Sequence, residues 1–173
     1  MTATDLRQID QTILDRIRSA VGDAGVITDE NDQAPFLRDE RGYYTGTTPM
    51  IVRPATTEEV ASVVSICNET RTPIVPQGGN TGLCGGATPY EHGGEVLMSL
   101  TRMNKVRDID VLNYAITVEA GVILADVQKA ADDVDRYFPL SLGGEGTALI
   151  GGNLSTNAGG TGTTSRRQWD RYH

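Results

Sequence analysis

Two glycine-rich segments constrain this chain more than any other feature of its sequence. The first glycine segment, residues 76–86, reads PQGGNTGLCGG, and the second glycine segment, residues 141–160, reads SLGGEGTALIGGNLSTNAGG. Glycine lacks a Cβ, so its main-chain N–H can approach an anion closely, and its φ > 0 conformations can aim successive N–H groups at one point. Both segments are therefore predicted to hold a ligand through main-chain contacts, and a phosphate or pyrophosphate is the expected group.

Charge and cysteine content exclude several classes of partner. The 173-residue chain has a formal net charge of −8, which argues against a nucleic-acid or anionic-membrane surface, because those partners need clustered Lys and Arg. Its two cysteines, Cys67 and Cys84, form neither a metal cluster nor a disulfide framework, which suits a reducing compartment. Residues 1–20 lack the apolar core of a signal peptide, and no run has the length of a transmembrane segment. The sequence predicts a cytoplasmic protein.

Hydrophobic periodicity predicts helices and short strands around the two segments. Helices are expected before Gly22, after Thr56 with Glu59 at capping-box spacing, and after Gly121. Strands are expected at 50–52, 73–76, 95–100, 106–109, 115–120 and 137–140. The three strands between residues 95 and 120 would form a small mixed sheet, and residues 25–48 would be mostly loop. Both glycine segments would then lie outside regular elements, where binding loops usually lie.

The sequence fits neither of two common nucleotide-binding motifs, which narrows the class of ligand. A Walker P-loop carries a lysine beside its phosphate-binding glycines, and residues 79–85 lack one. A Rossmann fingerprint needs G-x-G-x-x-G directly after the first strand, and residues 143–146 match it poorly. Two separate uncharged segments, rich in N–H donors and in Asn and Thr, fit an extended dinucleotide better. FAD is the natural candidate.

The ordered motifs resemble a known family. Residues from about Met50 to Gly160 resemble the FAD-binding domain of the vanillyl-alcohol-oxidase, or PCMH-type, flavoprotein superfamily. Within that superfamily, PQGGNTGLCGG together with GGNLSTNAGG is most similar to the D-2-hydroxyacid dehydrogenases of the D-lactate, D-2-hydroxyglutarate and glycolate type, and RPATTEEV at residues 53–60 supports the match. The resemblance implies an α+β fold, a PCMH-type FAD-binding domain that is incomplete at the C-terminus. It divides the chain into an N-terminal helix and loop (1–48), a partial FAD-binding domain (49–160) and a divergent tail (161–173).

The resemblance also implies which residues bind FAD. The group around the pyrophosphate is Pro76, Gly78, Gly79, Asn80, Thr81 and Gly82. The strand end near the adenosine half is Met98, Ser99 and Leu100. The residues along the ribityl chain and isoalloxazine are Pro139, Leu142, Gly143, Gly146 and Thr147. The second clamp is Gly151, Gly152, Asn153, Thr156 and Asn157.

Several of these residues have a simpler structural interpretation. Asn80 and Asn157 can be turn formers, because Asn tolerates the left-handed region. Glu145 is the only acid of the second glycine segment, and a solvated carboxylate is a commoner role for it than a base near the flavin. Covalent relatives often carry a histidine after the paired glycines of the first segment. This chain has Asn80 there, so the resemblance implies non-covalent FAD.

The implied parent function is oxidation of a small D-2-hydroxy acid by hydride transfer to FAD. The sequence identifies no catalytic residue, and its two histidines, His92 and His173, are too few for a metal site. The ending TGTTSRRQWDRYH departs from the family, so the chain is expected to be the amino-terminal part of a larger enzyme and inactive alone. The alternatives are another FAD-linked oxidase of the superfamily, acting on an alcohol or an aldonolactone, or a non-catalytic flavin-binding fragment.

Overall fold

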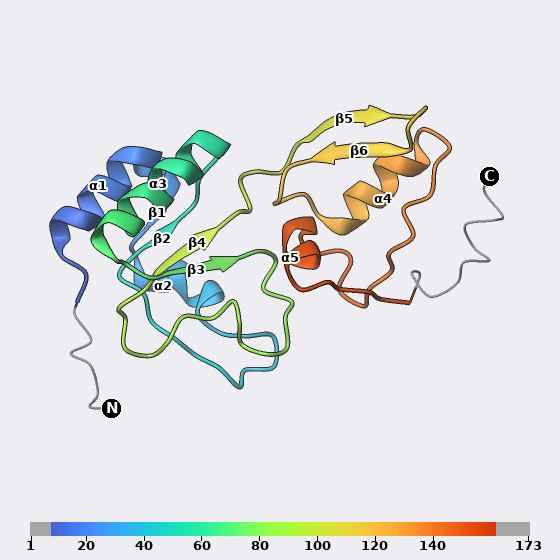
Figure 1. The fold of residues 1–173 in the computed structure, drawn as a ribbon. Helices are drawn as coiled ribbons and strands as arrows, with labels where there is room; N and C mark the ends of the chain where they lie inside the picture. The colour runs from blue at the N-terminus through green and yellow to red at the C-terminus, as the bar shows by residue number, and fades with distance from the viewer. Residues whose placement is uncertain (1–7, 162–173) are drawn as a thin grey trace. The chain divides into compact units, whose positions relative to one another are not determined.

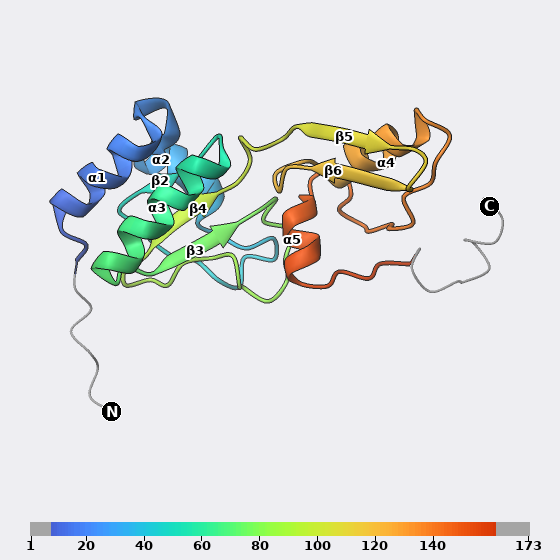
Figure 2. The same cartoon turned by 45° about the horizontal axis from the view of Figure 1, so that its top comes forward.

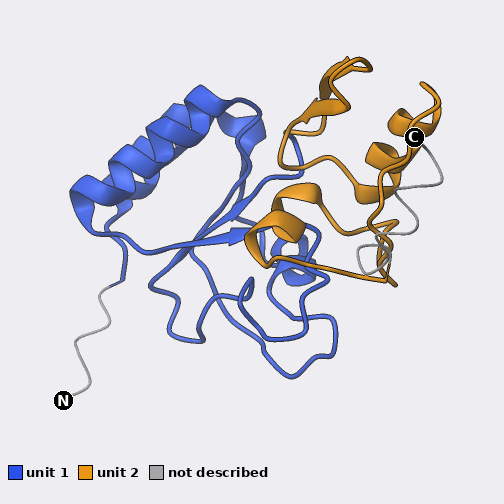
Figure 3. Ribbon diagram, turned by 45° about the vertical axis from the view of Figure 1, so that its right-hand side comes forward, with its two compact units in different colours: residues 1–102 blue, residues 103–173 orange. Residues whose placement is uncertain are grey.

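The computed structural model describes residues 8–161 and divides the chain into two compact units (Figures 1 and 3). Unit 1 comprises residues 1–102, and unit 2 comprises residues 103–173. Each unit combines helices with a small sheet of its own, and unit 1 contains both parallel and antiparallel strand pairs. The predicted α+β class is confirmed.

The sheet of unit 1 has four strands in the order β1-β2-β4-β3. These strands are β1 (Val26–Ile27), β2 (Ile51–Val52), β3 (Ile74–Gln77) and β4 (Val96–Ser99). Strands β2 and β3 both pair in parallel with β4, whereas β1 pairs antiparallel with β2. The carboxyl ends of the three parallel strands therefore meet at one edge of the sheet, and the first glycine segment leaves β3 there.

Two helices cover one face of this sheet (Figure 2). Helix α1 (Gln11–Val21) begins at Asp10, which accepts a hydrogen bond from the main-chain N–H of Thr12, and ends at Gly22 with φ 71°. Helix α3 (Thr57–Thr70) begins at Thr56, whose Oγ1 accepts from the N–H of Glu59 at 3.2 Å, as the capping-box spacing predicts. The core between helices and sheet contains Leu14, Ile17, Val21, Met50, Val52, Val63, Cys67, Val96 and Met98.

Residues 23–48 are mostly loop, as predicted for residues 25–48, but they include short regular elements. They contain β1, two 3-10 turns at Asp23–Gly25 and Ala34–Phe36, and the short helix α2 (Glu30–Gln33). Asp29 caps α2 by accepting from the N–H groups of Asn31 and Asp32. Strand β1 was not predicted because it has only two residues, so it shows no alternation, and because its pairing with β2 joins positions far apart in the sequence.

Unit 2 packs one hairpin against one helix (Figure 1). Strands β5 (Val106–Asp110) and β6 (Ala115–Val118) form an antiparallel two-stranded sheet, which is followed by α4 (Leu124–Asp132) and α5 (Ile150–Ser155). The core of this unit contains Val122, Leu124, Val127, Leu140 and Ile150.

Three sequence predictions fail in and around unit 2. The small mixed sheet does not form, because β4 belongs to the sheet of unit 1 and β5 pairs only with β6. Residues 137–140 form no strand: Leu140 donates its N–H to Phe138 and gives its carbonyl to the Gln128 side chain. The second glycine segment does not lie wholly outside regular elements, because it contains α5.

None of the helices within residues 8–161 is long and apolar enough to cross a membrane.

Candidate functional site

The first glycine segment begins at the carboxyl end of β3, beside the end of β4. Pro76 lies opposite Met98, and Gln77 lies opposite Ser99, whereas Leu100 donates its N–H to the Gln77 carbonyl at 3.1 Å. The residues predicted to meet the pyrophosphate and the adenosine half therefore meet at this edge. The Met98 side chain is only 4% exposed and packs in the hydrophobic core. Carboxyl ends of parallel strands are where open α/β sheets bind ligands.

The loop part of this segment, residues 78–86, offers a row of unused donors. Among the residues that the structure describes, the main-chain N–H groups of residues 78–86 donate to no protein acceptor. Main-chain N–H groups that a fold exposes in sequence form binding sites for anions. The loop therefore fits a phosphate-bearing group, which it would meet with dipoles and without a lysine.

The backbone of this loop includes left-handed residues. Asn80 has φ 53° and Gly85 has φ 71°, so both the predicted turn role of Asn80 and a glycine requirement at Gly85 are present. A Cβ at Gly85 would lie 2.6 Å from the ring of Tyr44. At Gly82, in contrast, a Cβ would meet nothing within 4 Å. That open side of Gly82 is free for a ligand.

The second glycine segment is organised around α5. The predicted clamp residues Gly151, Gly152 and Asn153 lie inside this helix, and Thr156 and Asn157 lie at its carboxyl end. The first N–H groups of the helix are used within unit 2: Ile150 donates to the Val122 carbonyl and Gly151 to the Ala120 carbonyl. A Cβ at Gly151 would lie 2.8 Å from Ala120, so this glycine allows a close approach between two segments of the protein.

The carboxyl end of α5 is likewise occupied by its own hydrogen bonds. Thr156 uses both its N–H and its hydroxyl to bind the Gly152 carbonyl. Asn157 has φ 50° and donates its N–H to Leu154, which is the turn-forming role that its residue type also permits. The groups of Thr156 and Asn157 that these bonds use are thus employed in ending the helix.

Asn153 is the exception in this clamp. The residue is 7% exposed, and its Nδ2 is buried without a hydrogen-bond partner in the part of the chain that the structure describes. Burying an amide donor without an acceptor costs about 1–3 kcal/mol. This unpaired donor is the second observation that fits a polar ligand.

The stretch before α5 supplies further open positions. A Cβ at Gly143 or Gly146 would meet nothing within 4 Å, whereas Thr147 donates its N–H and hydroxyl to the Gly144 carbonyl. Leu142 and Phe138 pack at the border of the unit 2 core, and Pro139 is half-buried beside them.

Glu145 is held by its neighbours. Its carboxylate accepts hydrogen bonds from the Gln128 amide at 3.2 Å and from the Ser141 hydroxyl at 3.3 Å. Its carbonyl accepts from the N–H of Ala125. These contacts give Glu145 a role in fastening the second glycine segment to α4.

Gln77, next to the loop, is a structurally important residue that the sequence motifs did not indicate. This side chain is 2% exposed, and its Nε2 donates to the carbonyls of Phe36 at 2.8 Å and Ala87 at 2.9 Å. A signal was present: in β3 the buried positions alternate, so Gln77 lies on the same side as the buried Val75. A polar residue at a buried strand position needs a partner, and that need identifies it as structurally specific.

The described residues contain no group of three or more His, Cys, Asp or Glu that could hold a metal ion. His92 accepts a hydrogen bond at Nδ1 from the N–H of Gly94 and stacks on Tyr90 at 5.6 Å between ring centroids. These contacts give His92 a role in a turn.

Comparisons with known proteins agree with these features. A family model described as FAD binding domain matches residues 48–169. A protein of Oryza sativa subsp. indica, named as a probable mitochondrial D-2-hydroxyglutarate dehydrogenase, is 41% identical over 143 residues. A D-lactate dehydrogenase of Anaerostipes hadrus is 40% identical over 136 residues. The matches cover 83% and 78% of this chain but 25% and 28% of those proteins, so the chain spans about a quarter of their length.

Solved structures share the fold. An alkyldihydroxyacetonephosphate synthase superposes with a TM-score of 0.81 at 19% identity, over 97% of this chain and 32% of the other. A p-cresol methylhydroxylase with bound substrate superposes with a TM-score of 0.67 at 25% identity, over 85% of this chain and 28% of the other. These neighbours confirm the predicted PCMH-type fold. From its fold, its open donors and the match over residues 48–169, the chain belongs to the family of FAD-binding domains.

Proposed function

We propose that this chain is the FAD-binding portion of a flavin-dependent oxidoreductase that oxidises a small D-2-hydroxy acid. The observation that carries the proposal is the row of unused N–H donors at residues 78–86, at the carboxyl end of β3. The named activities of the 40–41% identical relatives support the substrate class.

The residues proposed to hold FAD fall into two sets. In unit 1, the loop after Pro76 directs its N–H groups at the pyrophosphate, and the open side of Gly82 admits it. In unit 2, Asn153 provides a buried donor, and Gly143 and Gly146 leave room for a flat or extended ligand. When bound, FAD supplies an isoalloxazine ring that accepts a hydride from the substrate.

We propose that the cofactor is held without a covalent bond. Asn80 carries an amide, which is no nucleophile, and its Nδ2 already donates to the Arg38 carbonyl at 2.7 Å. Acid precipitation of the flavin-loaded protein should release all of the flavin into the supernatant. A yellow pellet would contradict this assignment.

The location proposed is a reducing compartment, with the cytoplasm as the expectation from the sequence. Cys67 and Cys84 are free thiols in the structure. Several relatives are named as mitochondrial, and the mitochondrial matrix is the competing location.

An alternative function within the same superfamily is oxidation of an alcohol. The p-cresol methylhydroxylase likeness supports a substrate other than a hydroxy acid, at a lower identity than the D-2-hydroxyacid relatives show.

Competitive titration of the full chain with FAD and FMN tests the cofactor-binding part of the proposal. A ligand with one phosphate, such as FMN, requires only one glycine segment, whereas this chain has two. FAD should therefore bind at least about tenfold more tightly than FMN, a difference of about 1.4 kcal/mol in binding free energy. Flavin fluorescence and its quenching on binding give both affinities. Equal or tighter binding of FMN would overturn the assignment.

A further inference from the structure

The loop part of the first glycine segment is held from outside by the segment that precedes the matched family region. Residues 36–46, here named the clasp segment, lie before residue 48, where the FAD-binding match begins. The Gln77 amide donates to the carbonyl of Phe36, and the Asn80 amide donates to the carbonyl of Arg38. The clasp segment and the loop that it contacts both lie in unit 1.

The clasp segment is itself well ordered by local hydrogen bonds. Arg38 and Thr45 form an antiparallel bridge, and Gly46 donates its N–H to the Leu37 carbonyl at 2.9 Å. Asp39 is 4% exposed, and its carboxylate accepts from the N–H of Tyr44 at 2.7 Å. The carbonyls that the clasp segment offers to the loop are therefore held in place.

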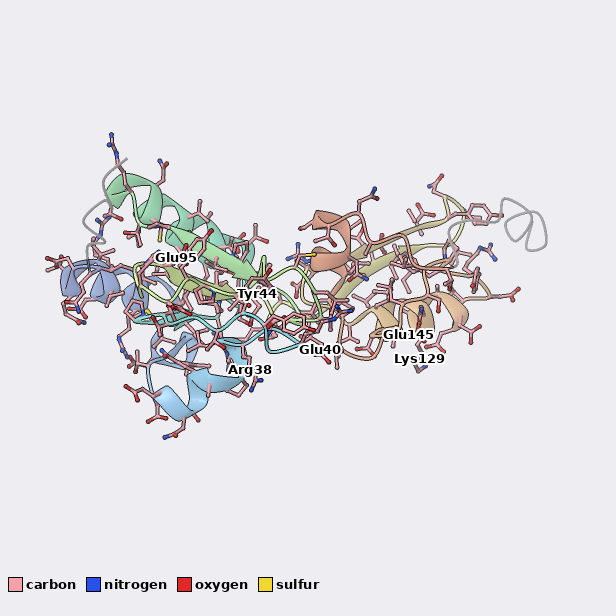
Figure 4. The ribbon with its side chains drawn as sticks, turned by 90° about the horizontal axis from the view of Figure 1, so that it is seen from below. Arg38, Glu40, Tyr44, Glu95, Lys129 and Glu145 are labelled. Atoms are coloured by element: carbon pink, nitrogen blue, oxygen red, sulfur yellow. The ribbon has the colours of Figure 1, made fainter. Side chains whose placement is uncertain are left out.

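The loop meets the clasp segment at a third point. The ring of Tyr44, labelled with Arg38 in Figure 4, lies against Gly85, where a Cβ would come within 2.6 Å of it. The Gln77 amide also donates to the carbonyl of Ala87, directly after the loop. One buried amide thus joins the start of the loop, its end and the clasp segment.

These contacts use side chains and carbonyls and leave the loop N–H groups free. The amide of Asn80 points to Arg38, while the N–H of Asn80 has no acceptor among the described residues. A site that is ordered before its ligand arrives avoids the entropy cost of ordering on binding. The side chains that fix the loop are therefore separate from the groups offered to the ligand.

We propose that Gln77, Asn80 and Tyr44 are positioning residues, through which the clasp segment preorganises residues 78–86 for the pyrophosphate of FAD. This inference rests on the proposed role of the loop in binding that pyrophosphate. It assigns a cofactor-binding role to residues 36–46, outside the matched domain.

The decisive variant is Asn80→Gly. Glycine keeps the φ of 53° accessible but removes the bond to the Arg38 carbonyl. Arg71→Gly is the matched control, because Arg71 also has a positive φ, 56°, in the same unit but ends α3. FAD affinity should fall about three- to tenfold in Asn80→Gly, the change expected for one hydrogen bond, and stay unchanged in Arg71→Gly.

A second pair tests the Tyr44 contact. Tyr44→Phe keeps the ring over Gly85 and should keep the affinity for FAD, whereas Tyr44→Ala should weaken it. The melting temperature without flavin is measured for every variant. A loss of affinity in Asn80→Gly with a melting temperature equal to that of Arg71→Gly supports positioning. If Asn80→Gly and Arg71→Gly bind FAD with equal affinity, the inference that Asn80 positions the loop is wrong.

A third variant separates this failure from failure of the binding site itself. Gly82→Val places a side chain on the open side of the loop, where its Cβ would meet no protein atom within 4 Å. Unchanged FAD affinity in Gly82→Val would overturn the pyrophosphate role of the loop, and the positioning inference with it. Weaker binding in Gly82→Val, combined with unchanged binding in Asn80→Gly, would overturn the positioning inference alone.

Discussion

At the scale of single residues, Asn153 gives the sharpest test of the second glycine segment. Its buried Nδ2 has no acceptor among the described residues, which costs about 1–3 kcal/mol unless a ligand supplies one. Asn153→Leu should leave the free energy of unfolding without flavin unchanged or higher, and should weaken FAD binding. Urea unfolding and flavin titration measure the two effects.

The control for this variant is Asn68→Leu, at an exposed position of α3. It makes the same chemical change without touching either glycine segment, so its FAD affinity should match the wild type. Wild-type affinity in Asn153→Leu as well would remove this residue from the site.

The alkylation rates of the two thiols give a separate test of the first glycine segment. Cys67 is 2% exposed and its burial raises the pKa of the thiol, so it should react slowly with an alkylating reagent. Cys84 is exposed within the loop part of the segment and should react quickly. Because FAD is proposed to cover this loop, saturating FAD should slow the fast reaction, as mass spectrometry of labelled peptides would reveal. Equal labelling of Cys84 with and without FAD would contradict the site.

Individual residues of the candidate site show how much of it could be predicted from the sequence. Gly82, Gly143 and Gly146 were predicted to contact FAD, and a Cβ at each of them would meet no protein atom within 4 Å. Gln77 was missed because its role depends on two carbonyls, at Phe36 and Ala87, that sequence spacing does not connect to it. The roles of the individual residues toward FAD stay predictions.

At the scale of elements, the β5–β6 hairpin depends on one carboxylate. Glu119 accepts from the N–H of Lys105 at 3.0 Å and from the guanidinium of Arg107, also at 3.0 Å. The hydrogen bond from the Lys105 N–H is the larger cause and the Arg107 guanidinium the smaller one, and together they hold the pKa of Glu119 below its ordinary value of 4.5. The pKa of Glu119 is lower in the folded chain than in the unfolded chain. The stabilisation by its carboxylate is therefore present above pH 4.5 and is lost as the pH falls through the folded pKa.

Glu119→Gln should therefore destabilise the hairpin near pH 7, and its difference from the wild type should shrink as the pH falls through the folded pKa of Glu119. Hydrogen exchange of the β5 and β6 amides, compared between the two proteins at each pH, measures this difference. Asp108→Asn, at an exposed position of β5, is the control. A difference between Glu119→Gln and wild type that persisted unchanged to low pH would show that the carboxylate charge is not involved.

Elements with local signals were predicted well, and those that depend on distant pairing were not. The caps at Asp10 and Thr56 and the stop at Gly22 are local, and α1 and α3 form as their periodicity indicates. Helix α5 contains two adjacent glycines and no side-chain cap, so nothing local favours it. It forms because the carbonyls of Ala120 and Val122 accept its first N–H groups, and those partners lie about thirty residues earlier.

At the scale of the whole molecule, the motifs predicted the family more securely than they predicted the architecture. The order of the glycine segments was enough to indicate a PCMH-type flavoprotein, which the family match and the solved structures confirm. The division at residue 102 was not predicted, because a boundary between compact units depends on which strands pair, and β4 pairs with strands that precede it.

The whole chain is expected to bind FAD but to have no D-2-hydroxyacid dehydrogenase activity alone. Oxidation requires the substrate carboxylate to be clamped and its hydroxyl deprotonated within reach of the flavin, usually by an arginine and a histidine or a metal-assisted base. The described residues contain no metal-binding cluster, and His92 is engaged with Gly94 and Tyr90. The chain spans about a quarter of the dehydrogenases that it matches.

An anaerobic assay decides this point. The FAD-loaded chain is mixed with D-lactate, D-2-hydroxyglutarate or glycolate, and bleaching of the flavin absorbance is followed. Chemical reduction with dithionite is the positive control, because it should bleach any bound FAD whether or not a substrate site exists. We expect bleaching with dithionite and none with the three acids. Bleaching by any of them at rates of about 1 per second or more, typical of enzymes, would show that the substrate-binding and proton-transfer groups lie within these 173 residues.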